Sequence, residues 1–313
     1  MTWRVLVSAP YILPVIEDFR SRLETEGVEI ITVSVRERLS EDELFPIIGT
    51  FDGVICGDDE FTHRVMAEAR RLKVISKWGT GIDSIDTLAA AELGIQIYNT
   101  PNAFTDAVAD TTLGYILCFA RQIPWMDQDI RQGFWKKPNT VSLAECRLGV
   151  IGVGNIGKAV VRRAKAFGMT LLGTDVTDIP KEFVEETGLV LLPLNELLKT
   201  SDFVTLHCDL NPTSFHLIGH NELAVMRSSA YLINTSRGSV VDEKALVQAL
   251  QNRIIAGVAL DVFEVEPLPS TSPLRLMENC LFAPHNANSS FVARKRVHES
   301  TIENLLKGLR EFG

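Results

Sequence analysis

A glycine-rich segment near the middle of the chain constrains its fold more than any other feature. The apolar residues 148–151 lead directly into Gly152, Gly154 and Gly157, spaced G-x-G-x-x-G, and a helical pattern follows over 158–167. Gly152 allows a tight turn between strand and helix, Gly154 lets the backbone approach a ligand, and Gly157 lets the helix pack against the strand. The segment therefore predicts a parallel β-α-β unit whose helix N-terminus can bind phosphate.

The residues around this segment favour one dinucleotide over another. The amides of Asn155 and Ile156 begin the helix, where the positive end of the helix dipole favours a diphosphate. Asp175 ends the next apolar stretch, and there its carboxylate can accept hydrogen bonds from the adenine ribose. A 2′-phosphate beside Asp175 would be repelled, and the following Val176 and Thr177 provide no arginine to hold it. The sequence thus predicts NAD rather than NADP.

Apolar segments alternate with helical patterns along most of the chain, which is typical of an α/β fold with parallel sheets. A length of 313 residues favours two domains. We expect strands at 5–8, 28–33, 51–56, 71–77 and 95–98, and again at 171–174, 203–207, 231–234, 255–260 and 280–283. We expect helices over 14–26 and 105–121, the latter ended before Pro124, and a C-terminal helix over 290–312.

Composition excludes several classes of function. A net charge of −9 disfavours contact with nucleic acid or an anionic membrane surface. Five cysteines without C-x-x-C pairs predict free thiols and no disulfide framework. No signal peptide or membrane-length apolar run is evident, so we expect a soluble, cytoplasmic protein. No cluster of His, Cys, Asp and Glu has metal-ligand spacing, so no metal is expected, and His63, His216, His220 and His298 are expected to be structural.

Three polar segments follow strands in the second half of the chain, where open parallel sheets place their ligands. They contain Arg237, the pair Asp261 and Glu266, and His285. Arginine matches a carboxylate with two parallel hydrogen bonds. Histidine titrates near neutrality, and a neighbouring carboxylate stabilises its protonated form. Such a set fits hydride transfer at a hydroxyl-bearing carbon, which needs a cation for the substrate carboxylate and a group that moves a proton.

Six motifs in order resemble the D-isomer-specific 2-hydroxyacid dehydrogenase family. They are Gly79-Thr-Gly-Ile-Asp83, Asn99-Thr-Pro, the glycine segment, Asn234-Thr-Ser-Arg237-Gly, Asp261-Val-Phe-Glu-Val-Glu266-Pro and Pro284-His285. The resemblance covers nearly the whole chain. It implies two Rossmann-like, doubly wound lobes, with the dinucleotide-binding lobe (99–286) inserted in a substrate-binding lobe (1–98 and 287–313), and a homodimer built on the dinucleotide lobe.

The resemblance also implies a role for each matched residue in the interconversion of a small D-2-hydroxy acid and its 2-keto acid. Arg237 would bind the substrate carboxylate, and His285, paired with Glu266, would be the acid and base. Asp261 would bond the nicotinamide carboxamide, and the amides of Thr80 and Gly81 would hold the substrate. The remaining residues implied in cofactor binding are His207, Thr235 and Ser236.

Some positions depart from the phosphoglycerate dehydrogenases of this family. Those enzymes hold phosphate partly with basic residues on the loop after the third strand, whereas this loop carries Asp58, Asp59 and Glu60 and no arginine. Phe104 stands where a small polar residue is usual, and Asn286-Ala-Asn288 replaces a glycine-rich run. If the acids border the substrate, phosphorylated hydroxy acids should be rejected; the alternative is that they face water.

Three other functions remain open at this stage. Phosphoglycerate dehydrogenase proper is one. Another is an NAD-sensing corepressor that does not catalyse, although no peptide-docking sequence is evident. The third is a relative that oxidises a small anion such as formate or phosphite.

Overall fold

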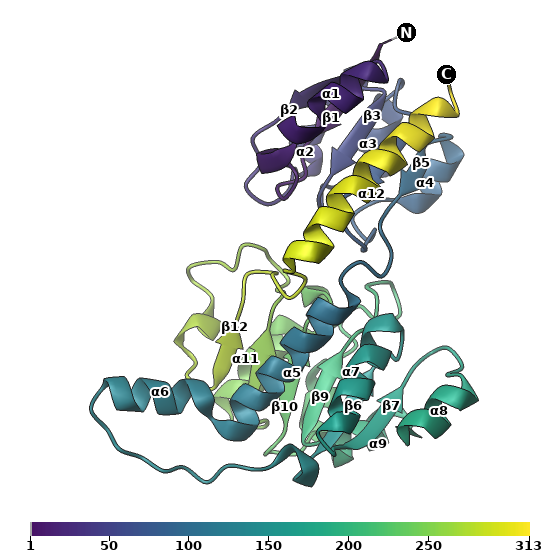
Figure 1. Ribbon diagram of the computed structural model, residues 1–313. Helices are drawn as coiled ribbons and strands as arrows, with labels where there is room; N and C mark the ends of the chain where they lie inside the picture. The colour runs from purple at the N-terminus through teal and green to yellow at the C-terminus, as the bar shows by residue number, and fades with distance from the viewer. Residues whose placement is uncertain (1) are drawn as a thin grey trace. The chain divides into compact units, whose positions relative to one another are not determined.

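A computed structural model describes residues 2–313, which form two compact units (Figure 1). One unit runs to Phe104 and resumes at Ser290–Gly313, and the other is Thr105–Ser289. The chain therefore leaves the first unit once and returns to it through its last helix. These limits differ by a few residues from the sequence-based ones at 98 and 287.

The first unit contains a sheet of five parallel strands in the order β2-β1-β3-β4-β5. The strands are β1 (Trp3–Val7), β2 (Val28–Thr32), β3 (Gly53–Cys56), β4 (Val74–Lys77) and β5 (Gln96–Tyr98). Every residue of β3 and β4 is buried, as expected of central strands covered on both faces. The carboxyl ends of β3 and β4 thus lead into two adjacent loops, 57–60 and 78–81.

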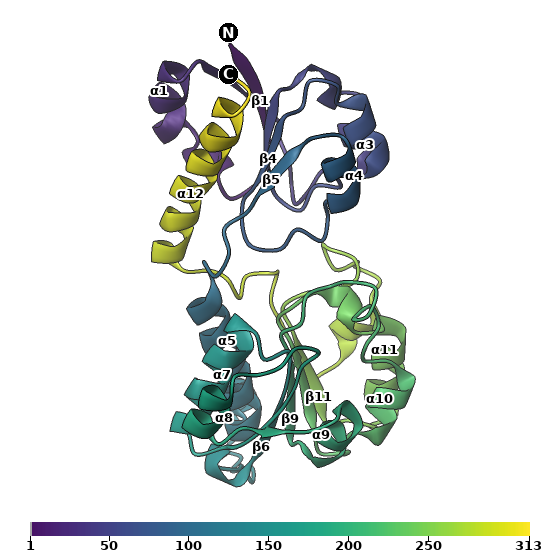
Figure 2. The same cartoon turned by 90° about the vertical axis from the view of Figure 1, so that its right-hand side faces the viewer.

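Helices cover both faces of this sheet. They are α1 (Glu17–Thr25), α2 (Glu41–Leu44), α3 (His63–Glu68), α4 (Thr87–Glu92) and α12 (Phe291–Arg310), with short 3-10 turns at Leu13–Val15 and Ile48–Thr50. Figure 2 shows α1 and α12 on one face and α3 and α4 on the other. Ser290 is the N-cap of α12, and its side chain accepts a hydrogen bond from the Ala293 amide. The helix buries Val297, Leu305 and Leu309 at helical spacing.

The second unit contains seven parallel strands in the order β12-β11-β10-β9-β6-β7-β8. They are β6 (Arg147–Ile151), β7 (Thr170–Thr174), β8 (Val190–Leu191), β9 (Phe203–Leu206), β10 (Tyr231–Asn234), β11 (Gly257–Leu260) and β12 (Cys280–Phe282). The strand order reverses at β6, which pairs with β7 on one side and β9 on the other. Doubly wound sheets bind ligands at such a reversal, outside the carboxyl ends of the strands.

Helices of the second unit also form two layers. They are α5 (Thr105–Arg121), α6 (Ile123–Arg131), α7 (Asn155–Ala166), α8 (Lys181–Thr187), α9 (Leu194–Thr200), α10 (His220–Val225) and α11 (Glu243–Gln251), with 3-10 turns at Leu143–Glu145, Gly238–Val240 and Pro273–Leu276. Figure 2 shows α5, α7 and α8 on one face of the sheet and α9, α10 and α11 on the other. Both units are therefore three-layered α/β structures, which confirms the predicted fold class.

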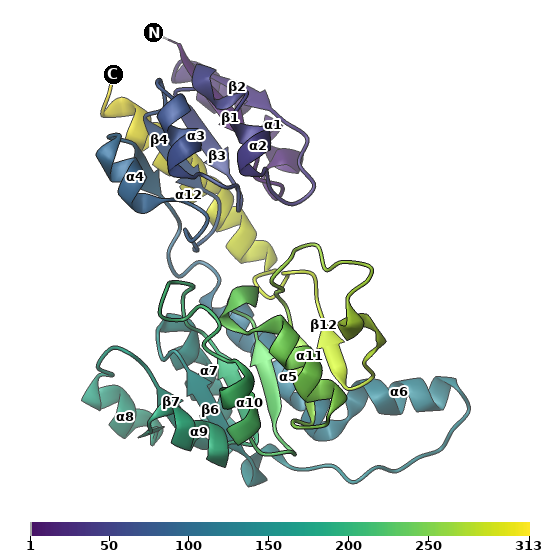
Figure 3. The same cartoon turned by 180° about the vertical axis from the view of Figure 1, so that it is seen from behind.

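α6 and the segment after it extend from the edge of the second unit (Figure 3). Trp125 is anchored within the unit, because its indole donates to the Glu278 carbonyl at 2.9 Å and its ring stacks on Phe119. Phe134 and Trp135, in contrast, are 51% and 81% exposed. The segment thus packs on its own unit at Trp125, whereas its apolar residues Phe134 and Trp135 are exposed.

Two compositional expectations can be compared with the structure. All five cysteines are free, as the sequence predicts. Among the described residues, none of the helices has the length and apolar character needed to span a bilayer.

Candidate active site

Among the three glycines of the loop between β6 and α7, only Gly154 has open space on its Cβ side. Gly152 has φ of +87°, and a Cβ there would lie 2.6 Å from the carbonyl carbon of His207. A Cβ on Gly157 would overlap the Gly152 carbonyl, whereas a Cβ on Gly154 would meet no heavy atom within 4 Å. Gly154 is the N-cap of α7, which begins at Asn155. The loop therefore has open space at the helix N-terminus, where a diphosphate fits.

Asp175, at the end of β7, is bound to this same loop. Its Oδ2 accepts a hydrogen bond from the Val153 amide at 2.6 Å, and its Oδ1 accepts from the amide and hydroxyl of Thr177, both at 2.8 Å. Partial burial alone would raise the pKa of Asp175, but the bonds from Thr177 and Val153 outweigh it and hold the pKa below its usual value. The ribose-binding candidate is thus a carboxylate fixed beside the glycine loop.

The other residues implied in cofactor binding follow β9 and β10. His207 is neutral, because burial lowers its pKa to about 3, and its Nε2 lies 2.9 Å from Thr205 Oγ1. Its Nδ1 is buried and has no hydrogen-bond partner among the described residues. Thr235 is buried, with its hydroxyl 3.2 Å from that of Thr112. These groups lie at the carboxyl ends of neighbouring strands in the second unit.

Asn234 organises the loop that carries Ser236 and Arg237, a role that its place in the sequence motif alone did not reveal. Its Oδ1 accepts from the amide and hydroxyl of Ser236 at 3.0 and 2.8 Å, and its Nδ2 donates to the Arg237 carbonyl at 2.9 Å. A Cβ on the next residue, Gly238, would overlap the backbone of Phe263. The Arg237 loop therefore packs directly on the loop that carries Glu266.

His285 and Glu266 are brought together. His285 Nδ1 lies 2.8 Å from Glu266 Oε2, and the second oxygen, Oε1, accepts the Phe263 amide at 2.9 Å. Both side chains are about a fifth exposed, at 22% and 23%. Because Glu266 bonds Nδ1, the proton that His285 exchanges with a ligand must be carried on Nε2.

Asp261 holds the chain around His285. It is almost fully buried, and its two oxygens accept the amides of Asn286 and Ala287, each at 2.9 Å, while its carbonyl accepts the His285 amide at 2.7 Å. Burial raises the pKa of Asp261 although the two amides oppose the rise. These bonds keep His285 at φ of +49°, a conformation that side-chain-bearing residues rarely adopt.

Thr80 and Gly81 lie in the first unit, on the loop after β4. The Gly79 carbonyl accepts the Thr100 amide at 2.8 Å, the Thr80 carbonyl accepts Asn99 Nδ2 at 2.6 Å, and the Thr80 hydroxyl donates to the Thr100 carbonyl. No described residue accepts a hydrogen bond from the amides of Thr80 or Gly81. Hydrogen bonds to its carbonyl groups and from the Thr80 hydroxyl thus hold the loop in place, and the amides of Thr80 and Gly81 can donate hydrogen bonds to a ligand.

The three acids of the loop after β3 differ in their surroundings. The alternative that all three face water does not hold for Asp59, because it is fully buried and accepts hydrogen bonds from the Ser8 hydroxyl and, at 2.6 Å, from the Leu39 amide. Glu60 forms an ion pair with Arg38 at 3.2 Å. The sequence could not distinguish Asp59 from its neighbours, because hydrogen bonds between distant segments leave no local pattern. Phe104 is also buried, and its ring lies 5.7 Å from that of Trp78.

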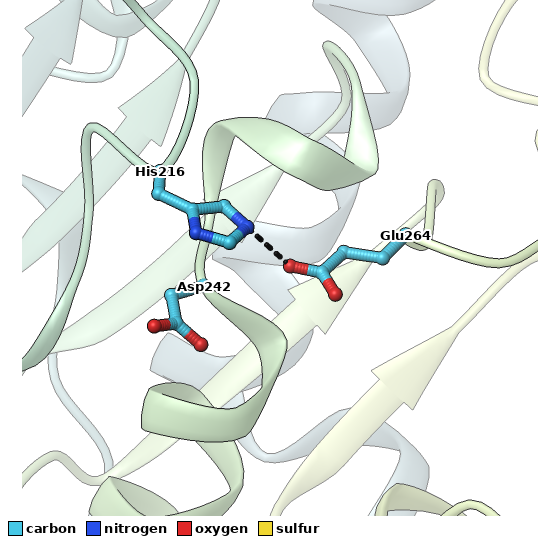
Figure 4. Close-up of side chains that lie close together, drawn as sticks. All are labelled: His216, Asp242 and Glu264. Carbon is cyan, nitrogen blue, oxygen red and sulfur yellow. Dashed lines mark hydrogen bonds and ion pairs between the residues drawn. The ribbon is translucent and has the colours of Figure 1, made fainter.

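His216, Asp242 and Glu264 form a second polar cluster (Figure 4). Their ligand-type atoms lie within 4.8 Å of one another, although the residues are too far apart in sequence for spacing to indicate them. Each has a protein partner: His216 Nε2 lies 2.7 Å from Glu264 Oε1, and Asp242 accepts the Ala245 amide as the N-cap of α11. The Glu243 amide at the start of α11 also donates to Glu264 Oε1 at 3.2 Å, which joins α11 to the loop that carries Glu266 and explains the cluster as a structural brace.

Comparison with known proteins agrees with this geometry. The family described as "D-isomer specific 2-hydroxyacid dehydrogenase, NAD binding domain" matches residues 113–287. The chain is 41% identical over 255 residues to a glyoxylate reductase of Korarchaeum cryptofilum, covering 79% of this chain and 76% of that one. It is 40% identical over 301 residues to a D-3-phosphoglycerate dehydrogenase of Methanocaldococcus jannaschii, covering 95% of this chain but 56% of that relative, so it spans little more than half of the latter's length.

A solved structure gives the same result for the whole chain. D-lactate dehydrogenase from Aquifex aeolicus, complexed with NAD and lactic acid, superimposes with a TM-score of 0.87 at 26% identity and covers 99% of this chain and 95% of its own. The family match also confirms NAD as the cofactor predicted from the glycine loop and Asp175. The chain belongs to the D-isomer-specific 2-hydroxyacid dehydrogenase family of NAD-dependent oxidoreductases.

Proposed function

We propose that the protein interconverts a small D-2-hydroxy acid and its 2-keto acid with NAD. The observation that carries the proposal is the hydrogen bond of 2.8 Å between His285 Nδ1 and Glu266 Oε2, at the carboxyl end of the second unit's sheet. A histidine backed by a carboxylate can give a proton to a keto oxygen and take it back from a hydroxyl.

Each remaining group has a part in this chemistry. When bound, NAD accepts or supplies the hydride. Arg237 binds the substrate carboxylate and carbonyl, and the amides of Thr80 and Gly81 provide further donors for the carboxylate. Glu266 keeps Nδ1 of His285 protonated, so that Nε2 is the nitrogen that exchanges a proton with the substrate oxygen. Asp261 maintains the backbone that presents His285, and its carboxylate is the group that we assign to the nicotinamide carboxamide.

Glyoxylate is the first substrate to test, because this chain is similar to glyoxylate reductases over most of their length. It is 41% identical to that of Korarchaeum cryptofilum over 76% of that protein, and 40% identical to that of Thermofilum pendens over 82% of that protein. Phosphoglycerate dehydrogenase activity is the second candidate. It is supported by 40% identity to the relative from Methanocaldococcus jannaschii, of which this chain spans 56%. The two candidates differ in the charge that the substrate carries beyond its carboxylate.

We also propose that the protein acts as a homodimer through the segment formed by α6 and residues 132–141. Ile123 and Ile130 of α6 are 50% and 53% exposed, and Phe134 and Trp135 follow them. A cluster of exposed large apolar side chains on one projecting segment is typical of a protein interface. A second copy of the chain is the occupant implied by the family resemblance.

The proposed activity is tested with purified protein, NADH and a panel of 2-keto acids that includes glyoxylate, pyruvate and hydroxypyruvate. We expect NADH oxidation with at least one of them, and a loss of roughly 10²–10⁴-fold in kcat for His285→Gln, because the variant cannot transfer the proton. Affinity for NADH, measured by fluorescence titration, should change little. Tight NADH binding without turnover of any 2-keto acid would instead indicate an NAD sensor.

A further inference from the structure

Lys77, at the end of β4, is a buried cation that the sequence analysis did not single out. Its side chain is 4% exposed, and lysines are rarely buried without a partner. Nζ lies 3.0 Å from Asp58 Oδ1 and donates to the Trp78 carbonyl at 3.2 Å. Two of the three N–H groups of the ammonium are thus accounted for by described partners.

The position of Lys77 places its charge directly behind the loop proposed to bind substrate. Nζ lies 3.8 Å from where a Cβ on Gly79 would stand, and Phe104 lies 3.9 Å from the same point. On the other side, Trp78 stacks on Tyr11 with ring centroids 4.7 Å apart. The loop therefore packs beside aromatic side chains and the ammonium group of Lys77.

The positive charge of Lys77 is already matched by its neighbours. Asp58, with 40% of its side chain exposed, forms the ion pair with it. Asp59 is close enough to interact electrostatically with both, and burial raises its pKa. With Asp58 ionised, the ammonium of Lys77 itself offers no net positive charge to an incoming anion.

We propose that the Lys77–Asp58 pair selects the substrate by charge at this loop. Because Asp58 neutralises the ammonium, the enzyme takes 2-keto acids whose third carbon is absent or carries a neutral group, and it rejects those that carry a phosphate there. The inference rests on the proposed function, since it assumes that the loop 79–81 holds the substrate carboxylate. It assigns specificity to Asp58 alone among the three acids of the loop.

The test compares hydroxypyruvate with phosphohydroxypyruvate, which differ only by the phosphate, as substrates for NADH-dependent reduction. Wild type should favour hydroxypyruvate in kcat/KM. Asp58→Asn removes the carboxylate of the ion pair with Lys77, so the ratio of phosphorylated to unphosphorylated substrate should rise about tenfold or more, with a smaller rise at high salt. Glu60→Gln is the matched control. It removes the same charge from the same loop, two residues after Asp58, but Glu60 pairs with Arg38 and not with Lys77, so the ratio should stay unchanged.

The double variant Asp58→Asn/Lys77→Met separates charge from folding. It replaces the pair by neutral side chains, which buried ion pairs often tolerate, and it should return the ratio to the wild-type value. A ratio that stays constant in Asp58→Asn, or a wild type that prefers phosphohydroxypyruvate, overturns the inference while leaving the proposed function intact. A wild-type preference for phosphohydroxypyruvate overturns the inference even if the variants do not fold. Failure of wild type to reduce any 2-keto acid overturns both.

Discussion

His285 combines an unusual backbone conformation with a fixed hydrogen bond. A φ of +49° costs a non-glycine residue on the order of 1 kcal/mol or more, and the three bonds to Asp261 compensate for it. The result is an imidazole whose Nδ1 is held against Glu266 by the protein's own hydrogen bonds. Such preorganisation lowers the cost of reaching the reactive arrangement.

Glu266→Gln should change the pH dependence of the reaction in opposite senses for its two directions. The Glu266 carboxylate stabilises the imidazolium form of His285. With the neutral glutamine side chain in its place, His285 should lose its proton at a lower pH. Reduction needs the protonated form, and its alkaline limb should move to lower pH; oxidation needs the neutral form and should gain at low pH. The measurement is kcat/KM against pH in both directions, and profiles identical to wild type would exclude the pairing from the mechanism.

At the scale of elements, the glycine loop, α7 and the end of β7 act as one structure because Asp175 binds the Val153 amide. Asp175→Ala should lower the preference for NADH over NADPH by about tenfold or more in kcat/KM, since a 2′-phosphate would no longer meet a carboxylate. Thr177→Val is the control: it removes a hydroxyl that bonds Asp175 but keeps the charge, and it should retain the preference. Equal use of both cofactors by wild type would contradict this role.

The sequence predicts long, buried elements better than short or exposed ones. β10 lies at the predicted residues 231–234, and α5 ends at Arg121 as expected. The sequence did not predict β8, because this strand has only two residues and both are exposed. The predicted helix 14–26 is divided into the 3-10 turn Leu13–Val15 and α1, with Pro14 in the turn.

The site follows the same rule. Arg237, Glu266 and His285 stand in local motifs, so they could be selected from the sequence. Lys77 could not, because its significance depends on Asp58 in a neighbouring strand's loop, and hydrogen bonds between distant segments leave no local spacing pattern.

At the scale of the whole molecule, the exposed end of the α6 segment gives a testable assembly. Trp135→Ser should weaken the proposed dimer by about tenfold or more, because large aromatic side chains dominate interface energetics. Phe291→Ser is the matched control, since Phe291 is 87% exposed but lies on α12 of the other unit. Light scattering across a dilution series gives the mass; a monomeric wild type at micromolar concentration would exclude the dimer.

The return of the chain to its first unit sets an order in which the protein can fold during synthesis. All of Thr105–Ser289 leaves the ribosome before α12, whereas the first sheet lacks one of the two helices on one of its faces (Figure 2) until residues 291–310 emerge. Ser76 donates to the Thr301 carbonyl at 2.8 Å, and Leu305 packs against Gly53, so α12 completes the core of that unit. The nucleotide-binding unit can therefore finish folding on the nascent chain, while the unit that was begun first cannot complete its core until α12 has been made.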